Sequence, residues 1–232
     1  MLVQEGATRT LATDLLLAAS LAFVAGGVNS AGYLAFGYFS ANMTGNVSLI
    51  SDHISTRQFA IALAFMAIVA MFILGALAAS SFIQIGKARG LRNIYALTLL
   101  AEAALLMGVG VAAYGSARPV SGLTIVGLLS FAMGIQNAAS TRISLSRVRT
   151  THVSGIATDI GVGLAMLLGE GDHHQRREIA GRLKLHSVTI TSFLAGGVAG
   201  VLSYNTIDGL AFCAFSIVLF GLCMRYVGRR AR

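Results

Sequence analysis

Long apolar runs dominate the pattern of hydrophobic and polar positions along this chain. A helix needs about 20 mainly apolar residues to cross the hydrocarbon core of a bilayer. Runs of this kind are separated by short polar or glycine-rich stretches. The pattern therefore predicts six transmembrane helices, over 15–38, 59–84, 94–115, 120–140, 185–204 and 209–227.

Two shorter apolar pieces lie between these runs. The segment Thr44 to Ile50 is too short to cross a bilayer. The segment 153–169 is at the lower limit of length for a crossing and contains Asp159 near its start, so the pattern fits either a short crossing or a partial helix.

One polar interruption occurs twice, once in each half of the chain. An apolar helix carrying Asn29 runs into Ala41-Asn42-Met43-Thr44-Gly45, and one carrying Asn137 runs into Thr151-His152-Val153-Ser154-Gly155. Both segments read small or Thr, polar, apolar, hydroxyl, Gly, and the second copy is two residues longer. Paired glycine-containing interruptions at corresponding places in two halves indicate the binding site of a transporter.

The composition agrees with a membrane protein and excludes an ordinary soluble domain. Hydrophobic residues make up 56% of the 232 residues and charged residues only 11%, whereas soluble domains carry about 25% charged residues. Almost the whole chain is needed for the spans, which leaves no room for a separate catalytic domain. The first apolar run is longer than the core of a signal peptide, so we interpret it as a retained span.

The distribution of basic residues decides between the two readings of 153–169. With six crossings and a cytoplasmic N-terminus, all but Arg57 and Arg118 of the 17 Lys and Arg residues fall on the cytoplasmic side. A seventh crossing would put the basic residues of 176–184 and of the C-terminus on the face opposite to those of 142–149, and the asymmetry of charge would be weaker. We therefore predict six crossings of the bacterial inner membrane, with both termini in the cytoplasm.

The predicted fold is an all-α integral membrane protein with six transmembrane helices in two inverted three-helix repeats. The repeats are inverted because each half has an odd number of spans, and each contains a broken or re-entrant segment. The two breaks are expected to converge near the midplane. The single membrane domain, 1–232, comprises a cytoplasmic tail (1–13), a first repeat (14–115) and a second repeat (116–227), which includes a cytoplasmic connector (170–184). The alternative is that the breaks are ordinary loops whose Gly and Asn residues form turns.

The two breaks also resemble a known family. The motifs Asn42-Met43-Thr44-Gly45-Asn46, Gly134-Ile135-Gln136-Asn137-Ala138 and Thr151-His152-Val153-Ser154-Gly155 resemble the YoaK-like family of bacterial inner-membrane proteins, a domain of unknown function. The resemblance runs from about residue 14 to residue 227. One departure is Asn29, where many members are expected to carry an acidic residue. The resemblance implies the architecture and brings no substrate.

Helices that begin at Thr44 and Ser154 would have these hydroxyls as N-caps and free backbone N–H groups in their first turns. The positive ends of the helices would favour an anion or a polar solute, and glycine would allow close approach of the ligand to the backbone. The alternative is capping without a ligand, or polar side chains that bond only a neighbouring helix. The candidate substrate-binding residues are Asn29, Asn42, Thr44, Gly45, Asn46, Gln136, Asn137, His152, Ser154 and Gly155.

Glu102 and Asp159 are the acidic residues deepest in apolar sequence, where ionisable groups are costly and often functional. Either could couple transport to protons or cations, and Asp159 is expected to face the site because it lies within two helical turns of Ser154. The structural alternative for Glu102 is a neutral carboxyl, or one paired with an arginine of 142–149.

No motif indicates catalysis or a cofactor. The chain has no Walker-type loop, nucleophile elbow or metalloprotease helix. The adjacent His173 and His174 lack the i, i+4 spacing that would direct both at one metal ion, which favours a solvated connector over a metal site.

The leading hypothesis is therefore a small secondary transporter or facilitator of a small polar or anionic solute, with its site between the repeats. A homodimer is compatible with the small size of the chain. The alternatives are a channel of the same architecture and a non-transporting membrane partner or assembly protein.

Overall fold

The computed structural model describes residues 1–115, 121–169 and 172–227, and its regular structure there is helical. Arg118 and the three arginines of 228–232, which entered the charge count, lie outside these residues, as does the start of the predicted connector. Six helices are long and apolar enough to cross a membrane: α1 (Leu11–Phe36), α3 (Phe59–Ala88), α4 (Ile94–Gly115), α5 (Gly122–Ser144), α7 (His173–Ile207) and α8 (Leu210–Val227).

The two unassigned pieces are short helices, α2 (Met43–Ser55) and α6 (Val153–Leu168). At 16 residues, α6 is about 24 Å long, less than the ~30 Å hydrocarbon core. The residues 173–184, predicted as part of a connector, instead form the beginning of α7, which Asp172 caps by accepting a hydrogen bond from the Gln175 N–H at 2.7 Å.

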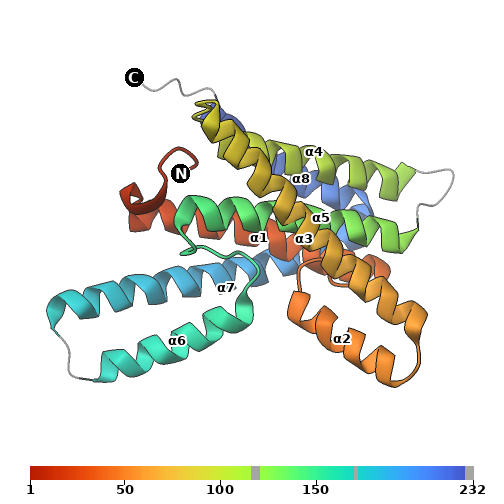
Figure 1. Ribbon diagram of the computed structural model, residues 1–232, viewed down its shortest axis with the longest axis horizontal. Helices are drawn as coiled ribbons and strands as arrows, with labels where there is room; N and C mark the ends of the chain where they lie inside the picture. The colour runs from red at the N-terminus through yellow and green to blue at the C-terminus, as the bar shows by residue number, and fades with distance from the viewer. Residues whose placement is uncertain (116–120, 170–171, 228–232) are drawn as a thin grey trace.

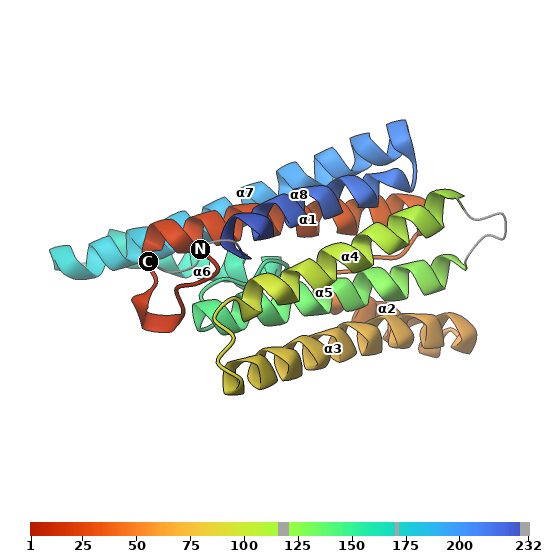
Figure 2. The same ribbon diagram turned by 90° about the horizontal axis from the view of Figure 1, so that it is seen from above.

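The helices form layers in which α4 and α8 lie on one face and α2 and α6 on the opposite face (Figure 1). Helices α1 and α5 lie between these layers, and α3 and α7 flank the bundle on opposite sides (Figure 2). The most extensive pairings are α1 with α7, α3 with α5 and α4 with α8, while α2 packs on α3 and α6 on α7. Each short helix thus makes a hairpin with the long helix that follows it.

Four helices carry a Phe-x-x-Gly sequence that lets their backbones touch. In each crossing pair, α1 with α7 and α3 with α5, the glycine of one helix lies against the carbonyl oxygen of the partner's phenylalanine. A methyl group would collide there: a Cβ built on Gly26, Gly196, Gly75 or Gly134 would lie 2.0, 1.9, 2.1 or 2.1 Å from the carbonyl oxygen of Phe193, Phe23, Phe131 or Phe72, respectively. Small residues at such crossings are typical of membrane helices.

The Gly196-x-x-x-Gly200 sequence of α7 takes part in the same crossing. A Cβ on Gly200 would lie 2.3 Å from the carbonyl oxygen of Gly27 on α1. Because there is little hydrophobic force between helices in lipid, close backbone contact of this kind stabilises the pair.

Both ends of the described chain lie at the same end of the bundle (Figures 1 and 2). The Asn93 side chain, just before α4, donates to the carbonyl of Val227 at the end of α8, and Lys87, near the end of α3, contacts Glu5. The predicted tail is not free, since Leu2 is buried and residues 1–10 fold over this end of the bundle. Helix α1 begins earlier than predicted because Thr10 and Thr13 form a capping box.

Replacing Gly75 by alanine is expected to lower the free energy of unfolding by about 1–3 kcal/mol, because the new methyl group overpacks the α3–α5 crossing. Gly108→Ala is the matched control: a Cβ there meets no heavy atom within 4 Å, so the better helix propensity of alanine leaves stability equal or slightly higher. Thermal unfolding of both variants in one detergent measures the difference. Equal unfolding temperatures would contradict the close approach of the two backbones.

Candidate functional site

A cavity of about 650 Å³ lies where the N-termini of α2 and α6 approach each other. Figure 1 shows the two short helices running away from this point in opposite directions, α2 toward one end of the bundle and α6 toward the other. The walls come from α1, α3, α5 and α7 and from the connectors before the short helices. The lining residues are Asn29, Phe39, Ala41, Asn42, Met43, Thr44, Gly45, Ser48, Phe72, Asn137, Thr141, Arg149, Thr151, His152, Val153, Ser154 and Phe193.

The structure brings most of the predicted site residues to this one cavity. Asn29, Asn42, Thr44, Gly45, Asn137, His152 and Ser154 all line it, although they come from both halves of the chain. Asn46, Gln136 and Gly155 are not lining residues, and neither are Glu102 and Asp159. The two interruptions that match in sequence therefore also meet in space.

The helix starts differ from the prediction by two residues. Thr44 and Ser154 are not N-caps but the second residues of their helices; the N-cap positions are Asn42 and His152. Asn42 has a non-helical backbone and its Oδ1 accepts the N–H of Gly45 at 3.1 Å, as an N-cap does. His152 makes no such hydrogen bond, so the first-turn N–H groups of α6 have no side-chain cap.

Gly45 and Gly155 lie directly against the cap residues of their own helices. A Cβ on Gly45 would lie 2.5 Å from Nδ2 of Asn42, and a Cβ on Gly155 would lie 2.1 Å from Nε2 of His152. In both copies the side chain at the N-cap position folds across the glycine three residues later. The sequence predicts that these glycines let a ligand approach the backbone, whereas in the structure they make room for the cap side chains.

Asn29 and Asn137 tie the non-helical connectors to the helices beside them. Oδ1 of Asn29 accepts the N–H of Ala41 at 2.9 Å, and Oδ1 of Asn137 accepts the hydroxyl of Thr151 at 3.1 Å. Nδ2 of Asn137 is also used, because it donates to the carbonyl of Met133 at 2.8 Å. Each asparagine thus holds the residue just before the N-cap, at the same place in the two copies.

Gln136 and Asn46 point into protein and not into the cavity. Nε2 of Gln136 donates to the carbonyl of Leu21 at 3.0 Å and to the hydroxyl of Thr150 at 3.1 Å. Nδ2 of Asn46 donates to the carbonyl of Phe39 at 3.0 Å. Both side chains are fully buried. These two residues therefore hydrogen-bond neighbouring protein groups, which is the alternative to binding a solute.

The two acidic candidates lie away from the cavity. Glu102 is fully buried in α4, and among the described residues neither carboxyl oxygen has a hydrogen-bond partner; the expected pairing with an arginine of 142–149 is not present in that set. Asp159 does not face the cavity: its carboxylate is largely exposed and lies 3.8 Å from Nε2 of His186 on α7. It faces away because α6 packs on α7, and this packing sets the rotation of the short helix.

Arg149 is a charged lining residue that is not among the site residues predicted from the sequence. It was counted only for membrane orientation, yet it lies in the connector before α6, is exposed and lines the cavity. The alignment of the two copies could have indicated it, because Arg149 stands three residues before His152 as Phe39 stands three residues before Asn42. The first copy thus places neutral residues at the two positions where the second places Arg149 and His152.

The described walls of the cavity are rich in hydrogen-bond donors and contain no carboxylate. Arg149 contributes a permanent positive charge, and the hydroxyls of Thr44 and Ser154 are exposed at the two helix starts. The partial positive charges of both helix N-termini add to this potential. Such an environment is suited to a small anion or to the electronegative part of a polar solute.

The fold and the cavity define an all-helical protein with six potential membrane spans and two short helices that meet at a polar cavity. The chain belongs to the family described as "Protein of unknown function (DUF1275)", whose model matches residues 17–225. The resemblance noted from the sequence is thus confirmed as a family of unknown function, and the YoaK-like name stays a prediction. Neither the curated proteins nor the solved structures compared with the chain give a match.

Asn42→Ala is expected to destabilise the protein by about 1 kcal/mol, because α2 loses its N-cap hydrogen bond to the Gly45 N–H. His152→Ala is the matched control at the corresponding position, where no cap hydrogen bond exists to be lost. Hydrogen exchange of the first-turn amides of α2 and α6, together with thermal unfolding, separates the two effects. A larger loss for His152→Ala than for Asn42→Ala would contradict the assignment of the caps.

Proposed function

We propose that the protein is a small secondary transporter or facilitator that moves a small anionic solute through the cavity between α2 and α6. The observation that carries this proposal is the convergence of two short helices, from the two halves of the chain, on one donor-rich cavity. Helices that stop inside a membrane protein and direct their N-termini at a common point are typical of transporter binding sites. The proposal assigns no catalytic step to the chain.

The charge of the cavity supports an anion over a cation. Arg149 and the two helix starts supply positive potential, and no acidic residue is among the described lining residues. A cation would find no carboxylate to replace its hydration shell. A monovalent anion, in contrast, would be neutralised by the single guanidinium and would meet backbone and hydroxyl donors.

An inverted repeat gives the simplest account of this arrangement. Asn29 follows Gly26 by three residues, as Asn137 follows Gly134, and the pairing of α1 with α7 has its counterpart in the pairing of α5 with α3. The exchange of glycine and phenylalanine contacts is the same in both pairs. We infer that the two halves are antiparallel copies that repack against each other during transport.

The orientation that we propose places both termini in the cytoplasm of a bacterial cell, in its inner membrane. The basic residues near the end of α3, the start of α4, the end of α5 and the end of α8 support it, because these helix ends lie at the same end of the bundle as the termini (Figure 1). Lys and Arg are enriched in the cytoplasmic segments of membrane proteins.

A homodimer is a further part of the proposal. Asn42, His152 and Arg149 are exposed at the cavity, on the face where α2 and α6 form the outermost layer. Lipid cannot satisfy polar groups at membrane depth, whereas a second copy of the chain packed on this face could enclose them.

The decisive experiment is uptake by proteoliposomes of a panel of small radiolabelled monovalent anions, with a neutral polar solute of similar size for comparison. We expect saturable anion uptake, and for Arg149→Gln an increase in KM of about tenfold or more, which corresponds to the loss of one charged hydrogen bond. Arg149→Lys should retain part of the affinity. Arg89→Gln, which removes a charge at the end of the bundle and not at the cavity, is the matched control and should leave KM unchanged.

The outcomes separate the candidate functions. Uptake that rises linearly with concentration would indicate a channel of the same architecture. Uptake equal to that of empty liposomes for every solute would reject transport of this class and favour a non-transporting membrane partner.

A further inference from the structure

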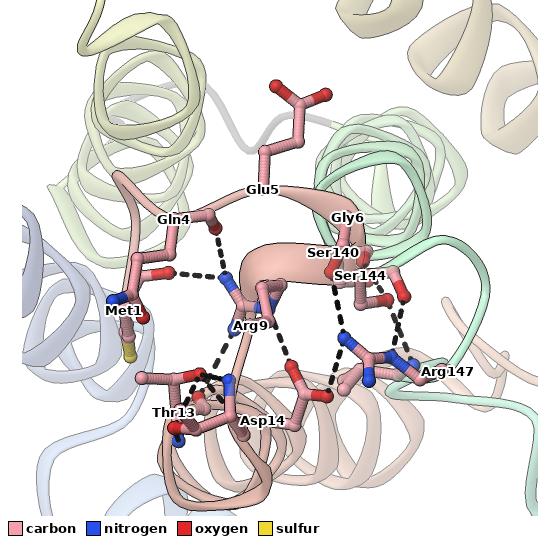
Figure 3. A network of polar contacts seen from close by, with 12 residues as sticks. Met1, Gln4, Glu5, Gly6, Arg9, Thr13, Asp14, Ser140, Ser144 and Arg147 are labelled. Atoms are coloured by element: carbon pink, nitrogen blue, oxygen red, sulfur yellow. Dashed lines mark hydrogen bonds and ion pairs between the residues drawn. The ribbon is translucent and has the colours of Figure 1, made fainter.

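The first ten residues, Met1–Thr10, form a strap that is built into the end of the bundle. Leu2 and Arg9 are buried within it, at 1% and 5% exposure. A short 3₁₀ turn, Gly6–Thr8, reverses the chain before α1 begins. The strap is therefore an ordered part of the fold, and Figure 3 shows it wrapped around the side chain of Arg9.

Arg9 holds the strap closed on itself and on α1. Its Nε donates to Oδ1 of Asp14 at 2.5 Å, and its Nη1 donates to the carbonyls of Met1 and Gln4 at 2.6 and 2.7 Å. Its Nη2 donates to the carbonyl of Thr13 at 3.2 Å. These four hydrogen bonds, from a buried guanidinium with five N–H donors, fix the path of the strap.

Glu5 ties the strap to the neighbouring helices. Its carboxylate accepts hydrogen bonds from Lys87 on α3 and from the hydroxyl of Tyr95 on α4, the latter at 2.7 Å. Burial raises the pKa of Glu5, but these hydrogen bonds and the charge of Lys87 outweigh burial, so its pKa lies below the usual value. Glu5 is therefore ionised at neutral pH and keeps both contacts.

Arg147 connects this strap to the segment 145–152, the connector between α5 and α6. Its Nη2 lies 3.2 Å from Oδ2 of Asp14 and donates to the carbonyl of Gly6 at 3.0 Å, while its Nε donates to the carbonyl of Ser144 at 3.2 Å. Asp14 is buried and its two oxygens are divided between Arg9 and Arg147 (Figure 3). One carboxylate thus joins the strap, α1 and the connector.

The connector that Arg147 holds has a strained start. Leu145 and Ser146 both have left-handed backbones, with φ of 51° and 63°, which residues with a side chain rarely adopt. The strained turn is retained by surrounding contacts: the N–H of Ser146 donates to the carbonyl of Thr141 at 2.8 Å, and the N–H of Val148 donates to the hydroxyl of Ser144 at 2.9 Å. Such strain persists only where neighbouring groups over-determine the conformation.

The same connector forms one wall of the cavity. Arg149, Thr151 and His152 line it and lie two to five residues after Arg147. A shift of Arg147 would therefore be passed along a few bonds to the only positive charge among the described lining residues. The corresponding wall in the first copy, which carries Phe39 and Asn42, has no contact of this kind with the strap among the described residues.

We propose that Asp14 and Arg147 are positioning residues for the cavity: their ion pair fastens the strained connector to the N-terminal strap, and so sets where Arg149 and His152 stand. Breaking the pair releases the connector and opens the cavity toward the end of the bundle that holds both termini. Any effect of this ion pair on solute movement rests on the proposed function, but the coupling of the strap to the cavity does not.

The test uses Val153→Cys as a reporter of access to the cavity. Val153 lines the cavity, and its apolar side chain has no hydrogen bond to lose. Cys213 and Cys223 are buried, so the wild-type chain serves as the background for the labelling rate. The rate of modification by a water-soluble maleimide is measured in full-length protein carrying Val153→Cys alone or together with Arg147→Gln, Arg147→Lys or Arg89→Gln. The side chain of Arg147 is 43% exposed. When Arg147 is replaced, Asp14 keeps Arg9 as its ion-pair partner.

We expect Arg147→Gln to raise the modification rate about tenfold, the factor given by loss of one charged hydrogen bond. Arg147→Lys keeps the charge beside Asp14 and should restore most of the protection, while Arg89→Gln should match the parent. A variant lacking residues 2–8 removes the contact to Gly6 without touching the connector and should also raise the rate. If Arg147→Gln does not fold, the labelling rate of this truncated variant tests the proposal instead.

Equal modification rates in the parent, Arg147→Gln and the truncated variant would overturn the proposal. This result can be told apart from failure of the proposed function because labelling requires no transport. Faster labelling with no uptake of any solute would support the coupling of the strap to the cavity and reject transport. Saturable uptake with unchanged labelling would support transport and reject the coupling.

Discussion

The structure depends on how a chain can leave the helical conformation inside a membrane protein. Each connector before a short helix has backbone groups that lipid cannot satisfy. Oδ1 of Asn29 meets this constraint by accepting the backbone N–H of Ala41, whereas Oδ1 of Asn137 accepts the side-chain hydroxyl of Thr151 and anchors its connector through that side chain. Because both connectors are anchored to a neighbouring long helix, the N-termini of the two short helices can meet and enclose a polar space between them.

Close contact of the long helices makes room for that space. The Phe-x-x-Gly sequences bring α1 against α7 and α3 against α5 with backbone touching backbone. Phe72 and Phe193, which belong to these sequences, also line the cavity. The features that pack the bundle therefore also shape the apolar walls of the cavity, and the polar groups at the helix starts provide its chemistry.

The two copies of the device are alike in backbone and different in charge. Both place a polar N-cap side chain across a glycine, but only the second carries Arg149, and only the second is fastened to the N-terminal strap through Arg147. One half of the cavity is thus neutral and locally held, whereas the other is cationic and tied to a distant part of the chain.

Six spans, two short interruptions and the match between the interruptions can be recognised from the amino-acid sequence, because apolar length and small polar motifs are local properties. The same match predicts that Asn29, Asn42, Asn137 and His152 lie near a common point. The direction in which each side chain faces cannot be read in this way: Gln136 and Asn46 turn into protein, Asp159 turns toward α7, and Arg149 turns into the cavity. The physical reason is that the rotation of a short helix and the path of a connector are set by the helices packed against them, and those contacts join residues far apart in the chain.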